Sequence, residues 1–497
     1  MYRQFFRALA AVAATYVAFF TAELFFEWHR LGMPGTEATS WVDVNDPKLM
    51  DLMSPVARGY NNVLAMLIAT IGLAIPLTAN MHTPKLIEMF LRDPLNQVVL
   101  FTEAFGAANV LWVAYMVGPH FAPTWAIALA VGGALVGWAV LIPYFFYVVR
   151  FLDPVNILDR LERETEKAID AVANGRLDSN AGQSVVHGRL QEIGTIVVKS
   201  LDRTDRDVAT HGIWLFKRLL DYHGARKARM PAGWFVVDRA DFVGTSAEAL
   251  EILQEDKVFF ERKVLDQLFF AYTHAISKAK DIVSSISDAN RVVAELASAR
   301  GDERSLELSI RYFNNFLREA IKGKHVHSVY DVFYQYRLLA QHLGDHPEHV
   351  RDITDAMASY ALDARRAGLA LTPSFATFDL AVIVLDAYRR KLTVAPDVLA
   401  CTLAMPEEVN GAREPLVIEG KMKLGAALAS MGEQAAAARV RACLSGVSEA
   451  ELVRMKNDLL GARRQFREVT DRQVDMRWVR PEDRAALDAF VASCASS

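Results

Sequence analysis

An acidic and an amide side chain lie inside a long apolar segment, where polar groups are costly. Glu103 and Asn109 both fall within residues 97–118, and Gly106 lies between them at roughly helical spacing. Glu103 is about six residues into this segment, about 9 Å from its end at the rise of an α-helix. These residues predict a narrow polar stripe with two interpretations: the lining of an ion or proton path, or a hydrogen-bonded glutamate that locks two helices together.

The sequence carries none of the common motifs for a catalytic or metal site. A phosphate-binding GxxxxGK[ST] loop, a GxSxG nucleophile elbow and HEXXH are all absent. His342 and His346 have the i,i+4 spacing of metal ligands, with His349 nearby, but Pro347 interrupts the helix that would present them. We therefore expect a solvated turn there, and a protein that is not an enzyme and binds no metal or cofactor.

Composition and charge restrict the class of protein further. Hydrophobic residues make up 52 % of the 497 residues, which excludes an intrinsically disordered chain. The formal net charge of −4 gives no general attraction to nucleic acid. The three cysteines, Cys401, Cys443 and Cys494, are widely spaced and predict reduced thiols in place of a disulfide framework.

Four apolar segments are long enough to cross a membrane, which takes about 20 residues. They lie at approximately 6–27, 60–81, 97–118 and 123–149. Aromatic residues near their ends, such as Tyr60, suggest an interfacial belt. Basic residues concentrate on one side of the segments, so the positive-inside rule predicts that both termini are cytoplasmic.

Two features of these segments predict contacts. Gly133 and Gly137 form a GxxxG pattern in the last span, which permits close approach of another helix, either within the chain or in a second copy. Thr83 and Pro84 predict the N-cap and first residue of an amphipathic helix over 84–92, at the inner membrane surface. Its inward face would consist of Leu86, Ile87, Phe90 and Leu91.

This inner loop has two interpretations of its own. Lys85 and Arg92 would meet anionic lipid headgroups if the helix lies on the membrane, at about 1 kcal/mol each. The alternative is a plain connecting helix between the second and third spans.

The segment TPKLIEMFLRDPLNQVVL, residues 83–100, resembles a family of predicted bacterial membrane proteins of unknown function. The similar positions include Pro84, Leu86, Phe90, Asp93, Gln97 and Leu100, with Lys85 where the family has arginine. Residues 155–169 and 254–277 resemble the family's helices after the membrane, so the likeness covers parts of about 55–300. The resemblance implies a multi-pass protein of the bacterial inner (cytoplasmic) membrane, and it assigns no chemistry.

The remainder of the chain shows helical periodicity nearly throughout. Loop-forming breaks divide it into a helical bundle at 151–345 and a second helical unit at 350–497. Residues 423–444 resemble a helix pair of the tetratricopeptide type, without a second copy at the expected period. Residues 234–244 are the one segment that favours an extended conformation.

The sequence thus predicts an all-α integral membrane protein with four transmembrane helices in residues 1–150, followed by a large α-helical cytosolic domain. Our first hypothesis is a homo-oligomeric channel or transport protein, gated or assembled by the cytosolic helices. The alternative is a non-catalytic membrane scaffold or accessory subunit of a larger membrane complex. The expected partners are membrane lipids and either further copies of the chain or a partner membrane protein, but not nucleic acid.

Overall fold

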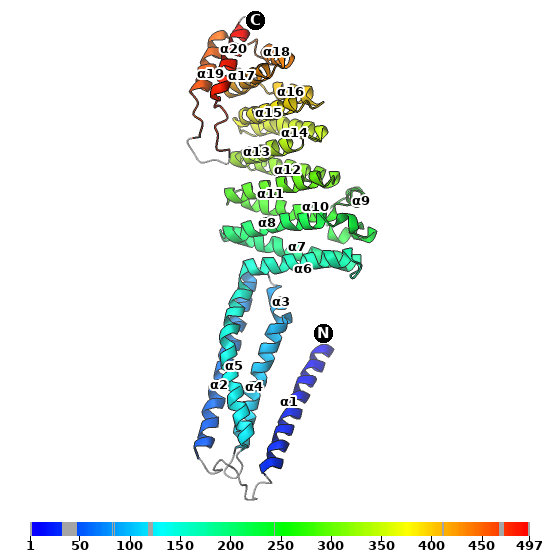
Figure 1. Ribbon diagram of the computed structural model, residues 1–497, viewed down its shortest axis with the longest axis vertical. Helices are drawn as coiled ribbons and strands as arrows, with labels where there is room; N and C mark the ends of the chain where they lie inside the picture. Colours follow the sequence, from blue (N-terminus) through cyan, green and yellow to red (C-terminus); the bar gives the residue numbers. More distant parts are fainter. Residues whose placement is uncertain are drawn as a thin grey trace. The chain divides into compact units, whose positions relative to one another are not determined.

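The computed structural model divides the chain into two compact units, residues 1–157 and 158–497, which are described separately (Figure 1). The described residues are 2–31, 47–81, 83, 85–117, 123–242, 244–409, 412–466 and 472–495.

Five helices lie wholly within the described part of the first unit. They are α1 (Tyr2–Leu31), α2 (Pro47–Met81), α3 (Leu86–Arg92), α4 (Pro94–Met116) and α5 (Thr124–Leu152). Among the described residues, three helical segments are long and apolar enough to cross a membrane: Met53–Met81, Pro94–Met116 and Thr124–Leu152. They coincide with the second, third and fourth predicted spans. The first predicted span, 6–27, lies within the continuous helix α1, and its crossing of a membrane stays a prediction.

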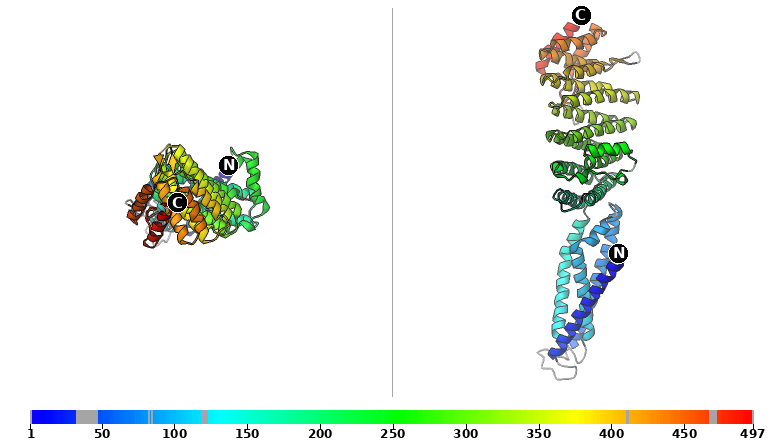
Figure 2. Two further views of the ribbon diagram at one scale, coloured as in Figure 1. Left: turned by 90° about the horizontal axis from the view of Figure 1, so that it is seen from above. Right: turned by 90° about the vertical axis from the view of Figure 1, so that its right-hand side faces the viewer.

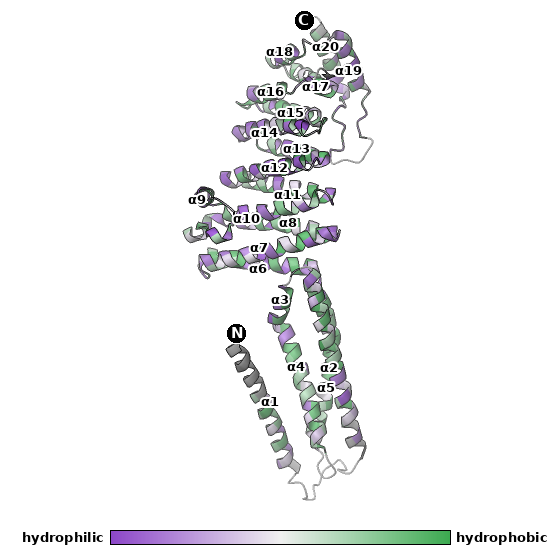
Figure 3. Ribbon diagram, turned by 180° about the vertical axis from the view of Figure 1, so that it is seen from behind, coloured by the Kyte–Doolittle hydropathy of each residue, from purple (hydrophilic) through white to green (hydrophobic). Residues whose placement is uncertain are grey.

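Helices α2, α4 and α5 pack against one another around a core of small residues. Ala107, Ala130 and Ala134 are almost fully buried between them, which lets the backbones approach closely. Large apolar side chains such as Leu73 and Phe146 are instead exposed on the outside, as expected for a surface that faces lipid. The three helices are accordingly mostly apolar along their length (Figure 3).

The second unit is a run of helices joined by short connections. The longer helices are α6 (Pro154–Ala173), which begins in the first unit, α7 (Ser179–Asp202), α8 (Arg206–Gly224), α10 (Phe259–Ala275), α11 (Lys280–Ala299), α12 (Glu303–Lys322), α13 (Val326–His342), α14 (Pro347–Arg366), α15 (Thr372–Arg389) and α17 (Pro415–Ser430). The shorter elements are η1 (Lys227–Arg229), η2 (Ala232–Phe235), η3 (Arg239–Asp241), α9 (Ala247–Glu255), α16 (Ala395–Leu403), β1 (Glu408–Val409), β2 (Ala412–Arg413), α18 (Gln434–Cys443), α19 (Glu449–Gly461), η4 (Pro481–Asp483) and α20 (Arg484–Ala495).

These helices stack in two rows, as Figures 1 and 2 show from different sides. The first row consists of α8, α11, α13, α15 and α17, and the second row of α7, α10, α12, α14, α16 and α18. Helices α10, α12 and α14 begin at Phe259, Glu303 and Pro347, two equal intervals of 44 residues. Each hairpin covers the apolar face of the next, which is how helical repeats of about 40–47 residues build a continuous core.

The turns that end these helices share one backbone geometry. Gly301 has φ +68°, its N–H bonds to the Ser298 carbonyl at 2.9 Å, and the next N–H reaches the Ala297 carbonyl at 2.9 Å. The same pattern follows α14, where the turn residue is Gly368 with φ +97°. These bonds satisfy the last carbonyls of each helix and reverse the chain within two residues.

The structure differs from the sequence-based organisation in two places. The segment expected to be extended, 234–244, forms η2 and η3 in its described part, because local 3₁₀ bonds such as Trp234 N–H to the Pro231 carbonyl close its turns. The expected boundary near 345–350 falls between α13 and α14, which pack on each other and on α15 within one compact unit. The pair at 423–444 forms part of the antiparallel hairpin α17–α18, with the turn at Gly432.

Candidate functional site

A tyrosine–glutamate pair lies at the centre of the first unit. The Tyr60 hydroxyl on α2 donates to Glu103 Oε2 on α4 at 2.7 Å, and each residue is 2 % exposed. A Cβ atom on Gly106 would lie 2.9 Å from the Tyr60 hydroxyl oxygen, and one on Gly137 would lie 2.3 Å from it. The ring therefore occupies the space that two glycines, one on α4 and one on α5, leave open.

Asn109, the third residue of the predicted stripe, makes a separate contact. Its Nδ2 donates to Glu23 on α1, at 3.1 Å to Oε2 and 3.3 Å to Oε1. One turn further along α1, Glu27 is fully buried and accepts from the backbone N–H of Ala126 at 2.8 Å. A carboxylate at this position satisfies an N–H in the first turn of α5 that has no partner within the helix.

The GxxxG pattern acts at only one of its glycines within this chain. Gly137 is buried against Tyr60, whereas a Cβ on Gly133 would meet no described residue within 4 Å. The close approach predicted for this pattern is therefore made by a side chain at Gly137, and Gly133 faces open space.

The inner-loop motif forms a joint between α3, α4 and α5. Asp93 is the N-cap of α4, where its carboxylate accepts from the N–H groups of Leu95 at 3.1 Å and Asn96 at 3.3 Å. The same carboxylate accepts from the Tyr147 hydroxyl on α5 at 2.8 Å. Pro94 occupies the first helical position, as expected after such a cap.

Further contacts complete this joint. Phe90 is 1 % exposed and packs edge-to-face on Phe151, with ring centroids 5.4 Å apart. Asn96 accepts from the Tyr144 hydroxyl at 3.2 Å, and Gln97 donates to the backbone carbonyl of Leu91, in the last turn of α3, at 2.8 Å.

One detail of the predicted inner helix is wrong. Helix α3 begins at Leu86 after the N-cap residue Lys85, which makes no side-chain capping bond, so Thr83 is not the cap; Pro84 lies outside the described residues. Leu86 and Phe90 are buried within the unit, whereas Ile87 and Leu91 are exposed on the surface of α3. Contact of these two exposed side chains with the membrane stays a prediction. Arg92 is exposed and pairs with Glu88 at 2.6 Å.

The second unit contains a site that the sequence did not indicate. Residues 472–480, here called the C-terminal strap, cross the first row. Arg472 donates to the Asp379 carboxylate on α15 and to the Tyr330 carbonyl on α13, at 2.7 and 3.0 Å. Lys423 on α17 donates to the strap carbonyls of Met476 and Trp478, at 2.6 and 2.8 Å.

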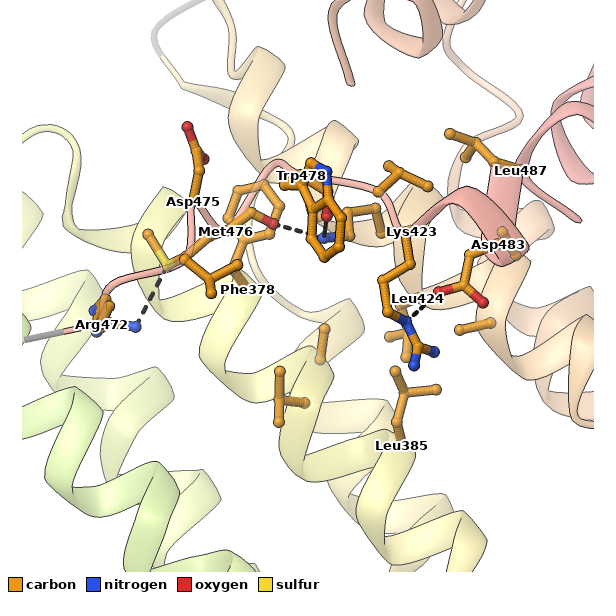
Figure 4. Close-up of a pocket in the computed structure, with 18 of the residues that line it drawn as sticks. Phe378, Leu385, Lys423, Leu424, Arg472, Asp475, Met476, Trp478, Asp483 and Leu487 are labelled. Carbon is orange, nitrogen blue, oxygen red and sulfur yellow. Dashed lines mark hydrogen bonds and ion pairs between the residues drawn. The ribbon is translucent and has the colours of Figure 1, made fainter. Parts of the chain in front are cut away.

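A cavity of about 440 Å³ lies between the strap, α15, α17 and the start of α20 (Figure 4). Its walls are largely apolar, including Phe378 and Leu385 on α15 and Trp478 on the strap. Burial lowers the pKa of Lys423, which lines this cavity, to about 8. Sequence spacing did not indicate the site, because the strap brings together residues 50–140 positions apart.

The histidines considered as metal ligands have other contacts. His349 and His346 both approach the carboxylate of Glu303, the latter at 3.6 Å. Within the described part of the chain, no group of three or more histidine, cysteine, aspartate or glutamate side chains is placed to hold a metal ion.

Comparison with known proteins supports the resemblance seen in the sequence. Residues 4–200 match the model of a family described as a predicted membrane protein (DUF2254), whose function is unknown. The likeness noted at 254–277 lies beyond this match and stays a prediction. No curated protein matches. One solved structure, a circular tandem repeat protein with novel repeat topology and enhanced subunit contact surfaces, is 13 % identical. The alignment covers 90 % of this chain and 95 % of that one, with a TM-score of 0.33.

Proposed function

We propose that this protein is a non-catalytic membrane scaffold or accessory subunit. Its apolar helices anchor the chain, and its helical hairpins dock a partner protein. The observation that carries the proposal is the regular stack of hairpins in residues 158–497, because stacked helical repeats present long, continuous surfaces on which other proteins bind.

The interior of the first unit favours an anchor over a channel. A channel in this chain would use Glu103 to line a water-filled path, yet Glu103 is 2 % exposed and bonded to Tyr60. Glu27, fully buried, accepts from the first turn of α5. Acids held by donors from neighbouring helices stabilise helix packing in a membrane, which supports the helix-locking interpretation of the polar stripe.

The membrane arrangement that we propose has four spans, with α1 as the first, in the bacterial inner membrane. Even numbers of spans leave both termini on one side, which the distribution of basic residues places in the cytoplasm. Exposed Ile87 and Leu91 beside Arg92 on α3 support contact of that short helix with the headgroup region.

The C-terminal strap supports the first row as the docking face. It is a non-helical segment held by groups from three successive helices of that row. The Tyr330 backbone carbonyl and the Asp379 carboxylate accept from Arg472, and the Lys423 side chain donates to two strap carbonyls. We propose that a non-helical segment of the partner binds α8 and α11 of the same row in this manner.

The test is photo-crosslinking of the full chain in native membranes. A photoreactive phenylalanine analogue replaces Trp214 on α8 of the first row. In the matched control it replaces Phe270 on α10 of the second row, which is 51 % exposed. We expect the Trp214 position to crosslink one protein that also co-purifies with the chain at a fixed ratio, and the Phe270 position not to do so.

A flux assay separates the scaffold from the channel. In proteoliposomes, Glu103→Gln should leave ion flux at the level of lipid vesicles without protein, like the unaltered chain. Two results together would overturn the scaffold in favour of a homo-oligomeric channel. The unaltered chain would support an ion flux that Glu103→Gln changes, and the purified particle would contain only this chain.

A further inference from the structure

The cavity beside the C-terminal strap is lined by cationic side chains whose hydrogen-bond donors are not all used within the described part of the chain. Asp379 is fully buried and is engaged by Arg472, which contacts both of its oxygens. Arg337 reaches the same carboxylate with one nitrogen only, at 3.2 Å. The Nε atom of Arg337 is buried and donates no hydrogen bond to the described residues. Two guanidinium groups thus contact the Asp379 carboxylate, and the buried carboxylate of Asp331 acts on Arg472 as well.

Lys423 is the second cation of the cavity without a carboxylate of its own. Its ammonium group donates to two neutral backbone carbonyls of the strap. The charged groups that act on it are Asp475, Asp483 and Glu419, which favour its protonated form, and Arg480, which opposes it. Each of these groups has another bond within the chain: Asp483 pairs with Arg480 at 2.8 Å, and Glu419 pairs with a strap arginine.

The remaining acid of the cavity is also occupied. One oxygen of Asp475 accepts from the backbone N–H of Arg477 at 2.9 Å. Arg337 and Lys423 each keep a hydrogen-bond donor that the described residues do not use: the Nε–H of Arg337 and one of the three ammonium hydrogens of Lys423. A buried donor without an acceptor is costly, and a ligand oxygen that enters the cavity relieves that cost. Because both donors are cationic, a carboxylate oxygen is favoured over a neutral one.

The walls define the rest of the ligand. Phe378, Leu385, Leu424 and Trp478 form apolar surfaces, while Arg472 and Asp483 lie at opposite ends of the cavity in Figure 4. A volume of about 440 Å³ is within the range of small-molecule sites, and an apolar lining with few polar groups is their usual composition.

We propose that this cavity binds a small organic carboxylate with an apolar body. The carboxylate lies against Lys423 and Arg337, and the apolar body lies between Phe378, Leu385 and Trp478. The site is independent of the docking function proposed above, because it lies at α15 and α17 and takes a small molecule.

The probe is 2-naphthoate, added to the full chain in lipid nanodiscs, with empty nanodiscs as the blank for partition into lipid. Isothermal titration calorimetry should show saturable binding of one naphthoate per chain. The neutral analogue 2-naphthylmethanol and the cation 2-naphthylmethylamine should each bind at least tenfold more weakly. Equal binding of the three compounds, stronger binding of the amine, or no saturable binding of naphthoate would overturn the proposal.

Variants locate the binding within the chain. Lys423→Met should weaken naphthoate binding at least tenfold, because a charge-assisted hydrogen bond is lost. Lys456→Met, which removes a lysine paired with Asp488 on α19–α20, should change it less than twofold. Leu385→Trp keeps every charge and fills the cavity, so it should also abolish binding. If Lys423→Met fails to fold, Leu385→Trp decides: unchanged naphthoate affinity in a folded Leu385→Trp protein would refute the site.

Discussion

The packing of Tyr60 between two glycines gives a quantitative prediction for Gly137→Ala. The new Cβ would lie 2.3 Å from the Tyr60 hydroxyl oxygen and 2.9 Å from Cε2, so the ring must move by about 1 Å to reach ordinary contact. A shift of that size lengthens the 2.7 Å bond to Glu103 beyond hydrogen-bonding range. Loss of the bond costs about 1–3 kcal/mol and overpacking a further 1–3 kcal/mol, so the free energy of unfolding should fall by about 2–6 kcal/mol.

The measurement is reversible unfolding of the full chain in mixed micelles by titration with SDS. Gly133→Ala is the matched control, since it lies one turn away in the same helix and its new Cβ would meet none of the described atoms within 4 Å. It should be neutral or stabilise by up to about 1 kcal/mol through helix propensity. Tyr60→Phe removes the hydroxyl oxygen, which is the atom closest to the new Cβ. In that background Gly137→Ala should therefore cost at least about 1 kcal/mol less than in the unaltered chain. Equal effects of the two glycine substitutions would refute this account of the packing.

Three further predictions concern the second unit. Burial lowers the pKa of Lys423 to about 8 in the folded chain, against about 10.4 in the unfolded chain. Between these two pH values the unfolded chain binds more protons than the folded chain. The free energy of unfolding should therefore increase by about 3 kcal/mol as pH rises from about 8 to 10.4. The gain should be missing in Lys423→Met, and parallel stability curves for the two proteins would contradict it. Asp379→Asn should lower the free energy of unfolding in urea by about 3–5 kcal/mol, because it leaves the buried Arg472 without its carboxylate. Adding Arg472→Met should restore part of that free energy. A loss below about 1 kcal/mol for Asp379→Asn would argue against the buried pair. In Gly425→Ala the new Cβ would lie 2.2 Å from the ring of Phe490 on α20, so amide hydrogen exchange over residues 484–495 should accelerate. Gly446→Ala is the control: its new Cβ would meet no described residue within 4 Å, and its exchange should match that of the parent protein.

The apolar helices of the first unit could be predicted from sequence because length and hydropathy are local properties. Three of the predicted spans coincide with helices of spanning length. The importance of Glu103 was equally visible, since an acid inside an apolar segment needs a partner. The sequence did not indicate which residue that partner is, because Tyr60 lies 43 residues away. An aromatic residue near the end of a span is expected at the lipid interface, not in the interior.

A local signal for the inner joint was present in the sequence and was assigned to the wrong helix. Thr83–Pro84 and Asp93–Pro94 are both a capping residue followed by proline, the usual start of a helix. Asp93 caps α4, and its carboxylate also accepts from the Tyr147 hydroxyl on another helix, whereas α3 begins only after Lys85. Spacing along the chain does not distinguish the two pairs, since both place a proline directly after a residue type that caps helices.

The repeat in the second unit escaped detection for a related reason. A period of 44 residues needs only that each hairpin presents an apolar face to the next, and many sequences satisfy this. One trace of the period is visible in polar residues: Arg291 on α11, Gln335 on α13 and Asp379 on α15 follow one another at intervals of 44 residues. Arg291 donates to Gln335 at 2.8 Å, so neighbouring repeats are joined at this position.

The acids of the first unit suggest a common role in fixing the positions of the helices. Glu103 accepts from a hydroxyl on α2, Glu27 from the first turn of α5, and Asp93 from a hydroxyl on α5. Apolar surfaces alone allow helices to slide or rotate in lipid, because one apolar contact replaces another at little cost. A buried carboxylate has only a few donors within reach, and losing them leaves it unsatisfied. Each pair therefore selects one register of its two helices. A membrane anchor requires such a fixed register, whereas a channel gate requires its helices to change register.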